Sequence, residues 1–202
     1  MLKIWGFAGS SNVQKVMWAA DELGLPWERI EINGPKLKEP AYVALNPNGL
    51  VPTVETDGQV LWESNTILRY LAGKYGRLTP ADPAGRANIE CWMDWQLSML
   101  TPHMAPLFRG LVRTPPEQRD PAALAHHHKM SVPLWTLLDA HLAGRDWVGG
   151  ADFTIGDIAP GVWVHRWYVM PVERPDLPRL HAWYQRLLAR PAYEKHVALA
   201  LK

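Results

Sequence analysis

The sequence of residues 52–62 is PTVETDGQVLW, in which two short segments flank the dipeptide Asp57-Gly58. Asp-Gly between such segments is typical of a two-residue β-hairpin turn, because both turn residues must adopt positive φ. We therefore expect antiparallel strands at residues 52–56 and 59–62. The hairpin matters for the fold class because the residues before it predict a parallel pair of strands. An antiparallel hairpin next to a parallel pair gives a mixed sheet.

The residues before the hairpin predict a strand–helix–strand unit. Residues 2–7 form a short apolar strand segment, and apolar residues from Val13 to Leu23 recur at helical spacing. Gly24 follows as a helix stop, and residues 27–32 predict a second strand. Two strands joined through a helix run parallel, so this unit and the hairpin together predict a mixed four-stranded sheet with helices on its faces.

The rest of the N-terminal region completes a βαβαββα order. Residues 33–45 are weakly patterned and have room for one short helix, and residues 64–72 predict a helix after the hairpin. We assign residues 1–76 to this α/β domain, and residues 77–85, which are rich in Pro and Gly, to a linker.

The remaining residues, 86–202, predict an all-α domain, so the chain as a whole is of the α+β class. Thr154 and Asp157 form a capping box at the start of one of its helices, with Thr154 at the N-cap. Helical patterns also cover residues 121–142, 180–189 and 192–199.

Composition excludes several function classes. The chain has 202 residues, a net charge of +1 and a single Cys. One Cys excludes a disulfide framework and a thiolate zinc site, and near-zero charge argues against nucleic acid as the main partner. No apolar run approaches the ~20 residues of a membrane helix, and the first residues lack a signal-peptide pattern. We expect a cytoplasmic protein with no membrane partner.

Three short motifs carry candidate chemistry. Ser10-Ser11-Asn12 lies between the first strand and the first helix, where it either caps the helix or stabilises an anion such as a thiolate. Val51-Pro52 precedes the hairpin, where a cis bond would leave the Val51 backbone unpaired for a peptide ligand. Glu63-Ser64 opens a helix, where it acts as a cap or as a site for a carboxylate and an ammonium group.

Two other features predict no chemistry. His126-His127-His128 are consecutive on a helix, where neighbouring side chains point about 100° apart, so the three cannot converge on one metal ion. We expect a solvated face there and no metal site. Cys91 lies among apolar residues, and we expect a small core residue. The chain also lacks the common phosphate-loop and hydrolase motifs.

Together these motifs resemble those of the cytosolic glutathione S-transferase family, over essentially the whole chain. The most specific segments are residues 10–16, SSNVQKV, residues 46–52, NPNGLVP, and residues 61–65, LWESN. The capping box at Thr154 also matches the family pattern. The resemblance is to bacterial, theta-like enzymes that use serine, and it implies a thioredoxin-like first domain that binds glutathione as co-substrate, with no covalently bound cofactor.

The resemblance also implies roles for individual residues. Val51 would pair its backbone with the cysteinyl unit of glutathione at the Pro52 turn, and Glu63 and Ser64 would hold the γ-glutamyl ammonium and carboxylate. Three residues are alternatives for the thiolate contact. Ser11 matches if Lys15 is the basic residue four positions later, a spacing of five selects Ser10, and a Thr-x-Asn pattern selects Asn12. We favour Ser11.

The same resemblance places an electrophile pocket largely in the helical domain. Our candidates there are Trp95, Met99, His103, Met104 and Phe108. Most of the 11 Trp residues are expected to pack the helical core. The family further implies a cytoplasmic homodimer in detoxification that acts on a small electrophile.

Two other functions remain open at this point. Asn12 in the Ser-x-Asn position is compatible with a glutathione-dependent disulfide reductase. A non-enzymatic binding or assembly module with the same fold is the third reading, although such a module has no need of Ser11, Val51 and Ser64 together.

Overall fold

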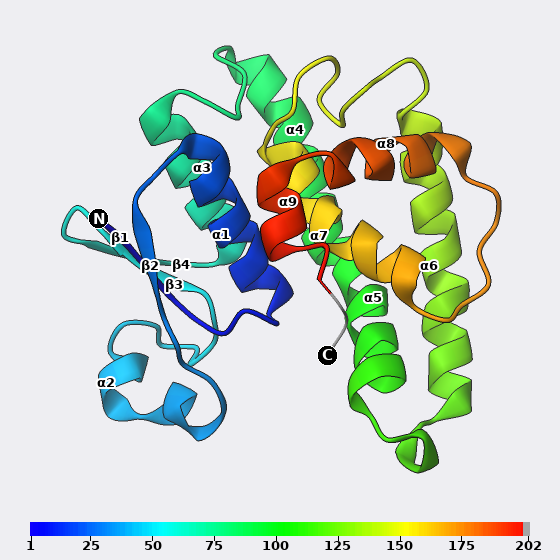
Figure 1. Cartoon of the computed structure of the whole chain (residues 1–202), viewed down its shortest axis with the longest axis horizontal. Coiled ribbons are helices and arrows are strands. Elements are labelled where there is room, and N and C mark those ends of the chain that lie inside the picture. The colour runs from blue at the N-terminus through cyan, green and yellow to red at the C-terminus, as the bar shows by residue number, and fades with distance from the viewer. Residues whose placement is uncertain (200–202) are drawn as a thin grey trace. The chain divides into compact units, whose positions relative to one another are not determined.

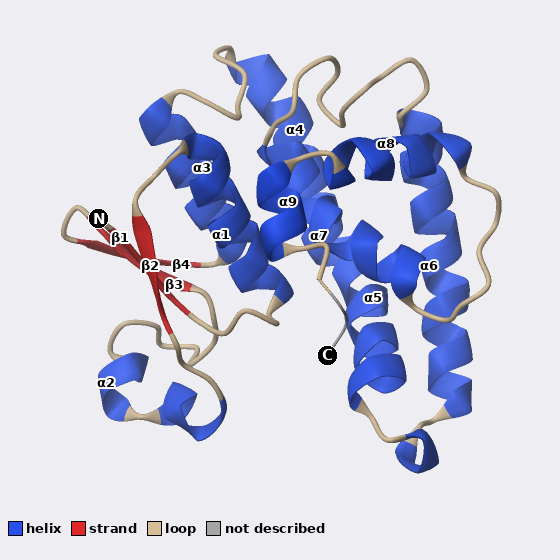
Figure 2. Ribbon diagram, in the orientation of Figure 1, coloured by secondary structure: helices blue, strands red, loops and turns tan. Residues whose placement is uncertain are grey.

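The computed structural model describes residues 1–199, so the last three residues of the expected helical domain, 200–202, lie outside the described residues. The chain divides into two compact units, residues 1–79 and 80–202. Strands of the sheet occur only in the first unit, and the described part of the second is built of helices and loops (Figures 1 and 2). The predicted α+β class is confirmed.

The first unit contains the predicted mixed sheet, in the order β2-β1-β3-β4. Strand β1 pairs in parallel with β2, and β3 pairs antiparallel with both β1 and β4. Both central residues of the hairpin turn have positive φ, 52° at Asp57 and 74° at Gly58, as the Asp-Gly signal predicts. The strands are β1 (Leu2–Trp5), β2 (Trp27–Ile30), β3 (Thr53–Thr56) and β4 (Gln59–Trp62).

The first two strands are shorter than predicted, because the pairing between them ends at Trp5 and Ile30. The apolar residues that follow each strand lie in a loop, so the apolar pattern alone placed the strand ends too late. The helices of this unit are α1 (Ser11–Leu23), α2 (Pro40–Val43) and α3 (Ser64–Tyr75), with a 3₁₀ turn, η1, at Gly34–Lys38. Helix α1 ends at Gly24 in the left-handed conformation, with φ of 70°.

Helices α1 and α3 pack side by side, as Figure 1 shows, and they share a core with the sheet. The β1 residues Leu2 and Ile4 and the β3 residue Val54 contribute to this core, together with apolar residues of both helices. The shared core thus places the starts of α1 and α3 in one packed unit, and those starts carry two of the three predicted motifs.

The second unit begins with one almost continuous helical run. It comprises α4 (Pro83–Trp95), a π-helical turn η2 (Gln96–Leu100), α5 (Thr101–Phe108) and a second π-helical turn η3 (Arg109–Arg113). Helix α4 starts inside the range expected as a linker, because Asp82 caps it by accepting a hydrogen bond from the Gly85 N–H. Next come η4 (Pro116–Gln118), α6 (Pro121–His141), α7 (Ile155–Val169), α8 (Pro178–Leu188) and α9 (Pro191–His196).

Helix α7 is the central helix of the second unit, since every residue from Ile155 to Trp167 is buried. Its predicted capping box is present. The Asp157 carboxylate accepts hydrogen bonds from Thr154 N (2.9 Å), Val148 N (2.8 Å) and Trp183 Nε1 (3.0 Å). Burial nevertheless raises the pKa of Asp157 to about 6, because these bonds offset only part of the cost of removing the charge from water.

Cys91 does not lie in the core: it is exposed. The reason is helical rotation. Helix α4 buries Ile89 and Met93, and Cys91 lies two residues from each, about 200° around the helix axis, so that it points away from the core. The expectation for tryptophan holds only within the second unit, which buries four of its seven indoles, Trp135, Trp163, Trp167 and Trp183; these are fewer than half of the 11 in the chain.

Candidate functional site: two helix starts and a cis-proline loop

The two serines at the start of α1 have different environments. Ser10 is the N-cap residue, and its Oγ accepts a long hydrogen bond of 3.5 Å from the Val13 N–H. Ser11 is the first helical residue, half-buried, and among residues 1–199 its hydroxyl makes no hydrogen bond. The capping reading therefore applies to Ser10, whereas Ser11 presents an uncommitted hydroxyl at the positive end of the helix.

The start of α3 lies against the start of α1. The Ser64 hydroxyl donates a hydrogen bond to Asn12 Oδ1 at 3.2 Å and accepts one from Lys15 Nζ at 3.4 Å. Lys15 Nζ also donates to Asn65 Oδ1 at 3.1 Å. Two helix N-termini, with their unpaired N–H groups and positive dipole ends, are thereby locked together by side chains, and such a place favours an anion.

Lys15 is the residue of this network whose role the sequence did not reveal. It entered the prediction only as a spacing marker for Ser11, yet its side chain has no exposed surface. A buried ammonium group needs acceptors around it, and Ser64 and Asn65 of α3 supply two of them. The signal available in the sequence was its position: Lys15 lies between Val13 and Val16, on the apolar face of α1.

Glu63, the residue before Ser64, is exposed and has φ of 70° and ψ of 111°. For a residue other than Gly this left-handed conformation is uncommon, and it is often found at ligand sites. The Glu63 side chain makes no capping hydrogen bond to α3. Its carboxylate is therefore available to a cation at the helix start.

The third motif has the predicted cis peptide bond, at Val51-Pro52. Among the described residues, the backbone N–H and C=O of Val51 have no hydrogen-bond partner. The preceding carbonyl of Leu50, by contrast, accepts from Tyr42 Oη at 2.6 Å and from Asn46 Nδ2 at 2.8 Å. The loop is thus anchored next to a free peptide group that can pair with an extended ligand.

Tyr42 and Asn46 were not predicted as supports of this loop. Both reach Thr53, with 2.8 Å from Tyr42 Oη to Thr53 Oγ1 and 3.2 Å from Asn46 Nδ2 to the same atom. Burial raises the pKa of Tyr42 above its ordinary value, so its hydroxyl remains protonated at neutral pH. No local signal in the sequence predicts these contacts, because Tyr42 and Asn46 lie 11 and 7 residues before Thr53.

Comparison with known proteins gives the family. A family model described as glutathione S-transferase, N-terminal domain, matches residues 9–74, and one described as glutathione S-transferase, C-terminal domain, matches residues 121–186. The chain belongs to the glutathione S-transferase family.

Individual glutathione S-transferases cover almost the entire chain. The curated glutathione S-transferase GstB of Escherichia coli (strain K12) is 42% identical, over 98% of this chain and 99% of GstB. A crystal structure of the theta class glutathione S-transferase from Xanthomonas axonopodis pv. citri with glutathione bound is 46% identical. It has a TM-score of 0.96 and covers 100% of this chain and 99% of that one. The predicted family and enzyme class are confirmed.

A more distant relative has a different named activity. The disulfide-bond oxidoreductase YfcG of Escherichia coli (strain K12) is 28% identical, over 92% of this chain and 90% of YfcG.

Among the described residues no helix is both long and apolar enough to cross a membrane.

The five residues expected in the electrophile pocket of this glutathione S-transferase lie along α4, η2 and α5, in different environments. Trp95 is half-buried, with its ring 5.1 Å from that of Trp92, and Met99 is 51% exposed. Met104 has no exposed surface and packs in the interior. It faces inward because α5 buries the side that carries Met104, Leu107 and Phe108.

The remaining two candidates have specific partners inside the second unit. The Phe108 ring, which is buried, lies 5.1 Å from the guanidinium carbons of both Arg113 and Arg166. His103 lies beside His126 and His127 of α6. Of the five, Trp95, Met99 and His103 therefore keep accessible surface, and Met104 and Phe108 act in packing.

Proposed function

We propose that this glutathione S-transferase joins the sulfur of glutathione to a small, hydrophobic electrophile, with Ser11 as the residue that stabilises the thiolate. The observation that carries the proposal is the uncommitted Ser11 hydroxyl at the N-terminus of α1, next to the Asn12–Ser64 contact. The bound glutathione in the Xanthomonas relative, at 46% identity, supports glutathione as the co-substrate.

Binding of glutathione would use the three motifs in one unit of the chain. The free N–H and C=O of Val51, beside cis-Pro52, pair with the backbone of the cysteinyl residue in the manner of an added strand. Glu63 accepts from the γ-glutamyl ammonium group, and Ser64 together with the α3 N-terminus holds the γ-glutamyl carboxylate.

Ser64 has only one proton to donate, and in the free protein it donates that proton to Asn12 Oδ1. A bound carboxylate would accept this hydrogen bond in place of Asn12, while Lys15 Nζ continues to donate to the Ser64 oxygen. A hydroxyl that accepts from an ammonium group is polarised and is a stronger donor to the carboxylate. Asn12 is thus the residue whose partners change when the γ-glutamyl group binds.

The chemistry requires a lowered thiol pKa. A free thiol has a pKa near ~8.5, and lowering it by two units takes about 2.7 kcal/mol of preferential stabilisation of the thiolate. One hydrogen bond to a charged group supplies roughly 1.5–3 kcal/mol, and a helix N-terminus adds roughly 0.3–1 kcal/mol. The Ser11 hydroxyl and the start of α1 are together sufficient. The thiol proton passes to solvent and the sulfur lone pair forms the S–C bond. In a substitution the displaced electron pair departs with the leaving group, and in an addition the π pair moves to the electron-withdrawing end of the electrophile, which then takes a proton from solvent.

A direct test combines binding and turnover. Calorimetry should detect glutathione binding at or below millimolar concentration, and conjugation of an aromatic chloride should release one chloride for each thioether formed. The absence of detectable binding would contradict the proposal, and binding without conjugation of any tested electrophile would restrict it to the glutathione site.

Disulfide reduction is the second candidate, favoured by Asn12 and by the relative YfcG. The thiolate of one glutathione would attack a disulfide to give a mixed disulfide and a released thiolate, and a second glutathione would resolve it to oxidised glutathione. A glutathione transferase of Burkholderia graminis, 28% identical over 97% of this chain and 87% of that one, with a TM-score of 0.86, was solved with two glutathione molecules per subunit. Turnover of a small mixed disulfide would separate this function from conjugation.

The family resemblance extends the proposal to the cell. We propose a cytoplasmic homodimer with a role in detoxification, and no nucleic-acid or membrane partner. Gel filtration combined with light scattering tests the dimer, since a mass near that of one 22.8 kDa chain would exclude it. The earlier reading as a non-enzymatic module is not retained, because the relatives at 42% and 46% identity are glutathione S-transferases.

A further inference from the structure

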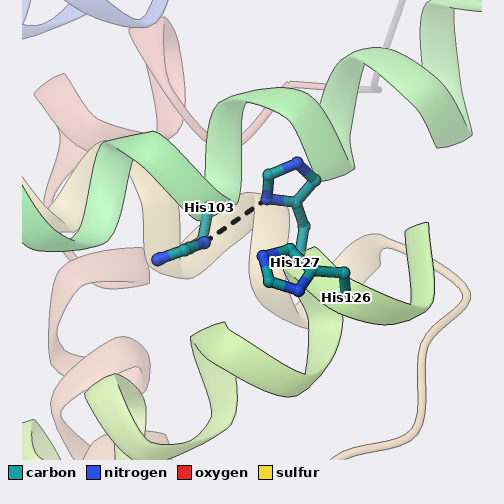
Figure 3. Close-up of side chains that lie close together, drawn as sticks. All are labelled: His103, His126 and His127. Atoms are coloured by element: carbon teal, nitrogen blue, oxygen red, sulfur yellow. Dashed lines mark hydrogen bonds between the residues drawn. The ribbon is translucent and has the colours of Figure 1, made fainter. Parts of the chain in front are cut away.

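Three histidines of the second unit come together between α5 and α6, two helices that pack against each other (Figure 3). His103 lies on α5, and His126 and His127 lie on α6. One ring nitrogen from each of the three lies within 4.8 Å of the other two. This is a cluster of three metal-ligand groups outside the proposed glutathione site.

The spacing of the closest pair suits a metal ion. His103 Nδ1 and His127 Nδ1 are 3.3 Å apart. Two imidazole nitrogens bound to one Zn²⁺ at ~2.05 Å, with a tetrahedral angle between them, lie about 3.3 Å apart. In this structure the pair forms a hydrogen bond, and its length matches the separation that a shared tetrahedral cation requires, so the ion would replace the hydrogen bond once both rings turn their lone pairs toward it.

His126 supplies the third nitrogen after a small movement. Its nitrogen has to close from at most 4.8 Å to about 3.3 Å from the others. His126 is exposed, and its ring lies 5.2 Å from that of His127 and 6.1 Å from that of His103, so rotation about its side-chain bonds meets little resistance. Two adjacent histidines of α6, His126 and His127, can thus contribute to one site, because the third ligand comes from α5 and not from the same triplet.

The third histidine of the triplet points elsewhere, as the sequence predicted for consecutive residues. His128 Nε2 lies 2.7 Å from the carbonyl oxygen of Glu173, and the His128 ring stacks on Trp167 with centroids 5.8 Å apart. The expectation of a solvated face at residues 126–128 therefore holds for His126 alone, because His127 and His128 are half-buried and contact His103 and Trp167 respectively.

The surroundings leave room for a fourth ligand. His127 lines a surface pocket of about 250 Å³ together with Arg119 and Asp120. The Asp120 carboxylate accepts through Oδ1 from the Ala122 and Ala123 N–H groups at the start of α6. Burial and the two neighbouring histidines lower the pKa of His127, which favours the neutral imidazole that binds metals.

We propose that His103, His126 and His127 bind one divalent transition-metal cation of the Zn²⁺ or Cu²⁺ type, with water from the adjoining pocket as the fourth ligand. Imidazole nitrogen is a preferred donor for these ions, and three histidines with one open position are an established zinc arrangement. The proposal shares no residue with the glutathione-binding motifs of the first unit, although His103 is also a candidate for the electrophile pocket.

The test uses the full-length chain with any affinity tag removed and with metal stripped by a chelator. Calorimetric titration with ZnSO₄ should give one site per chain. Co²⁺ should produce the intense visible absorption of a four-coordinate site. His126→Ala is the primary variant because the residue is exposed and its loss leaves the His103–His127 contact intact. It should weaken Zn²⁺ binding at least tenfold.

Two controls make the result specific. His128→Gln changes the neighbour within the triplet, and His181→Ala removes an exposed histidine of α8, so both should bind Zn²⁺ like the unchanged chain. His103→Gln keeps a polar group toward His127, and its thermal unfolding midpoint shows whether the fold is retained; with the fold intact, it should also weaken binding at least tenfold. Binding equal in His126→Ala and His181→Ala, a weak six-coordinate Co²⁺ spectrum, or no binding at millimolar Zn²⁺ would overturn the proposal.

Discussion

Replacing Ser10 and Ser11 by Ala, one at a time, should separate stability from catalysis in adjacent residues. Ser10→Ala removes the oxygen that accepts from the Val13 N–H, whereas Ser11→Ala removes a hydroxyl with no partner among the described residues. We expect Ser10→Ala to lower stability and leave turnover within about twofold. We expect Ser11→Ala to do the reverse.

The magnitudes follow from the two environments. Loss of an N-cap typically costs about 1 kcal/mol, and the 3.5 Å contact of Ser10 places it toward the lower end of the range. In a chain of this size about 1 kcal/mol lowers the unfolding midpoint by roughly 2–4 °C. A lost hydrogen bond to the thiolate is roughly 1.5–3 kcal/mol, which raises the bound thiol pKa by about 1–2 units. For Ser11→Ala, kcat/KM at pH 7 should therefore fall about 10- to 100-fold.

The pH profile is the decisive assay. For Ser11→Ala the rise of kcat/KM with pH should move upward by about 1–2 units, and activity should approach that of the unchanged chain once pH exceeds the new pKa. The ultraviolet absorbance of bound thiolate should shift in parallel. Ser10→Thr, which retains a capping hydroxyl, is the matched control and should change neither stability nor profile.

Two results would refute the reasoning. If Ser10→Ala shifts the pH profile and Ser11→Ala does not, the hydroxyl that caps the helix is also the one that holds the sulfur. If neither variant shifts the profile, the thiolate is stabilised by Asn12 or by backbone N–H groups of α1, and no serine hydroxyl is required.

Three further predictions concern other parts of the chain. Lys15→Met should raise KM for glutathione about 5- to 10-fold with kcat within twofold, because Ser64 loses a positioning donor, and an unchanged KM in steady-state kinetics would contradict this. The pKa of Asp157 is about 6 in the folded chain against 3.8 unfolded, so the folded state binds the proton more tightly. Asp157 therefore contributes about 3 kcal/mol to the free energy of unfolding below pH ~4, and this contribution is lost as pH rises through ~6. In denaturant unfolding, the stability of Asp157→Asn should lack this pH dependence. In the folded chain, Cys91 should react with a thiol reagent as fast as the thiol of a free peptide does, because it is exposed. A Cys91 thiol that reacts only after the chain is unfolded would contradict this prediction.

Much of the fold could be predicted because its signals act between residues at most four apart. The Asp57-Gly58 turn, the Gly24 helix stop and the Thr154–Asp157 capping box each depend on local backbone geometry and on hydrogen bonds to near neighbours. Such energies are nearly independent of the rest of the molecule. The division of roles between Ser10 and Ser11, by contrast, was left open by the sequence, because it depends on the residue at which α1 begins, and the structure places that start at Ser11.

The tertiary structure alone decided which helix faces meet. The sequence by itself determined an α/β unit followed by helices, with Ser11, Val51 and Ser64 in motifs near helix or strand starts. It did not determine that Lys15 is buried against α3, or that His103 meets His126 and His127, because these contacts join residues that are 23 to 50 positions apart. They depend on how far each helix is rotated about its axis when apolar faces pack, and that rotation minimises the exposed apolar surface of the whole unit rather than of any one segment.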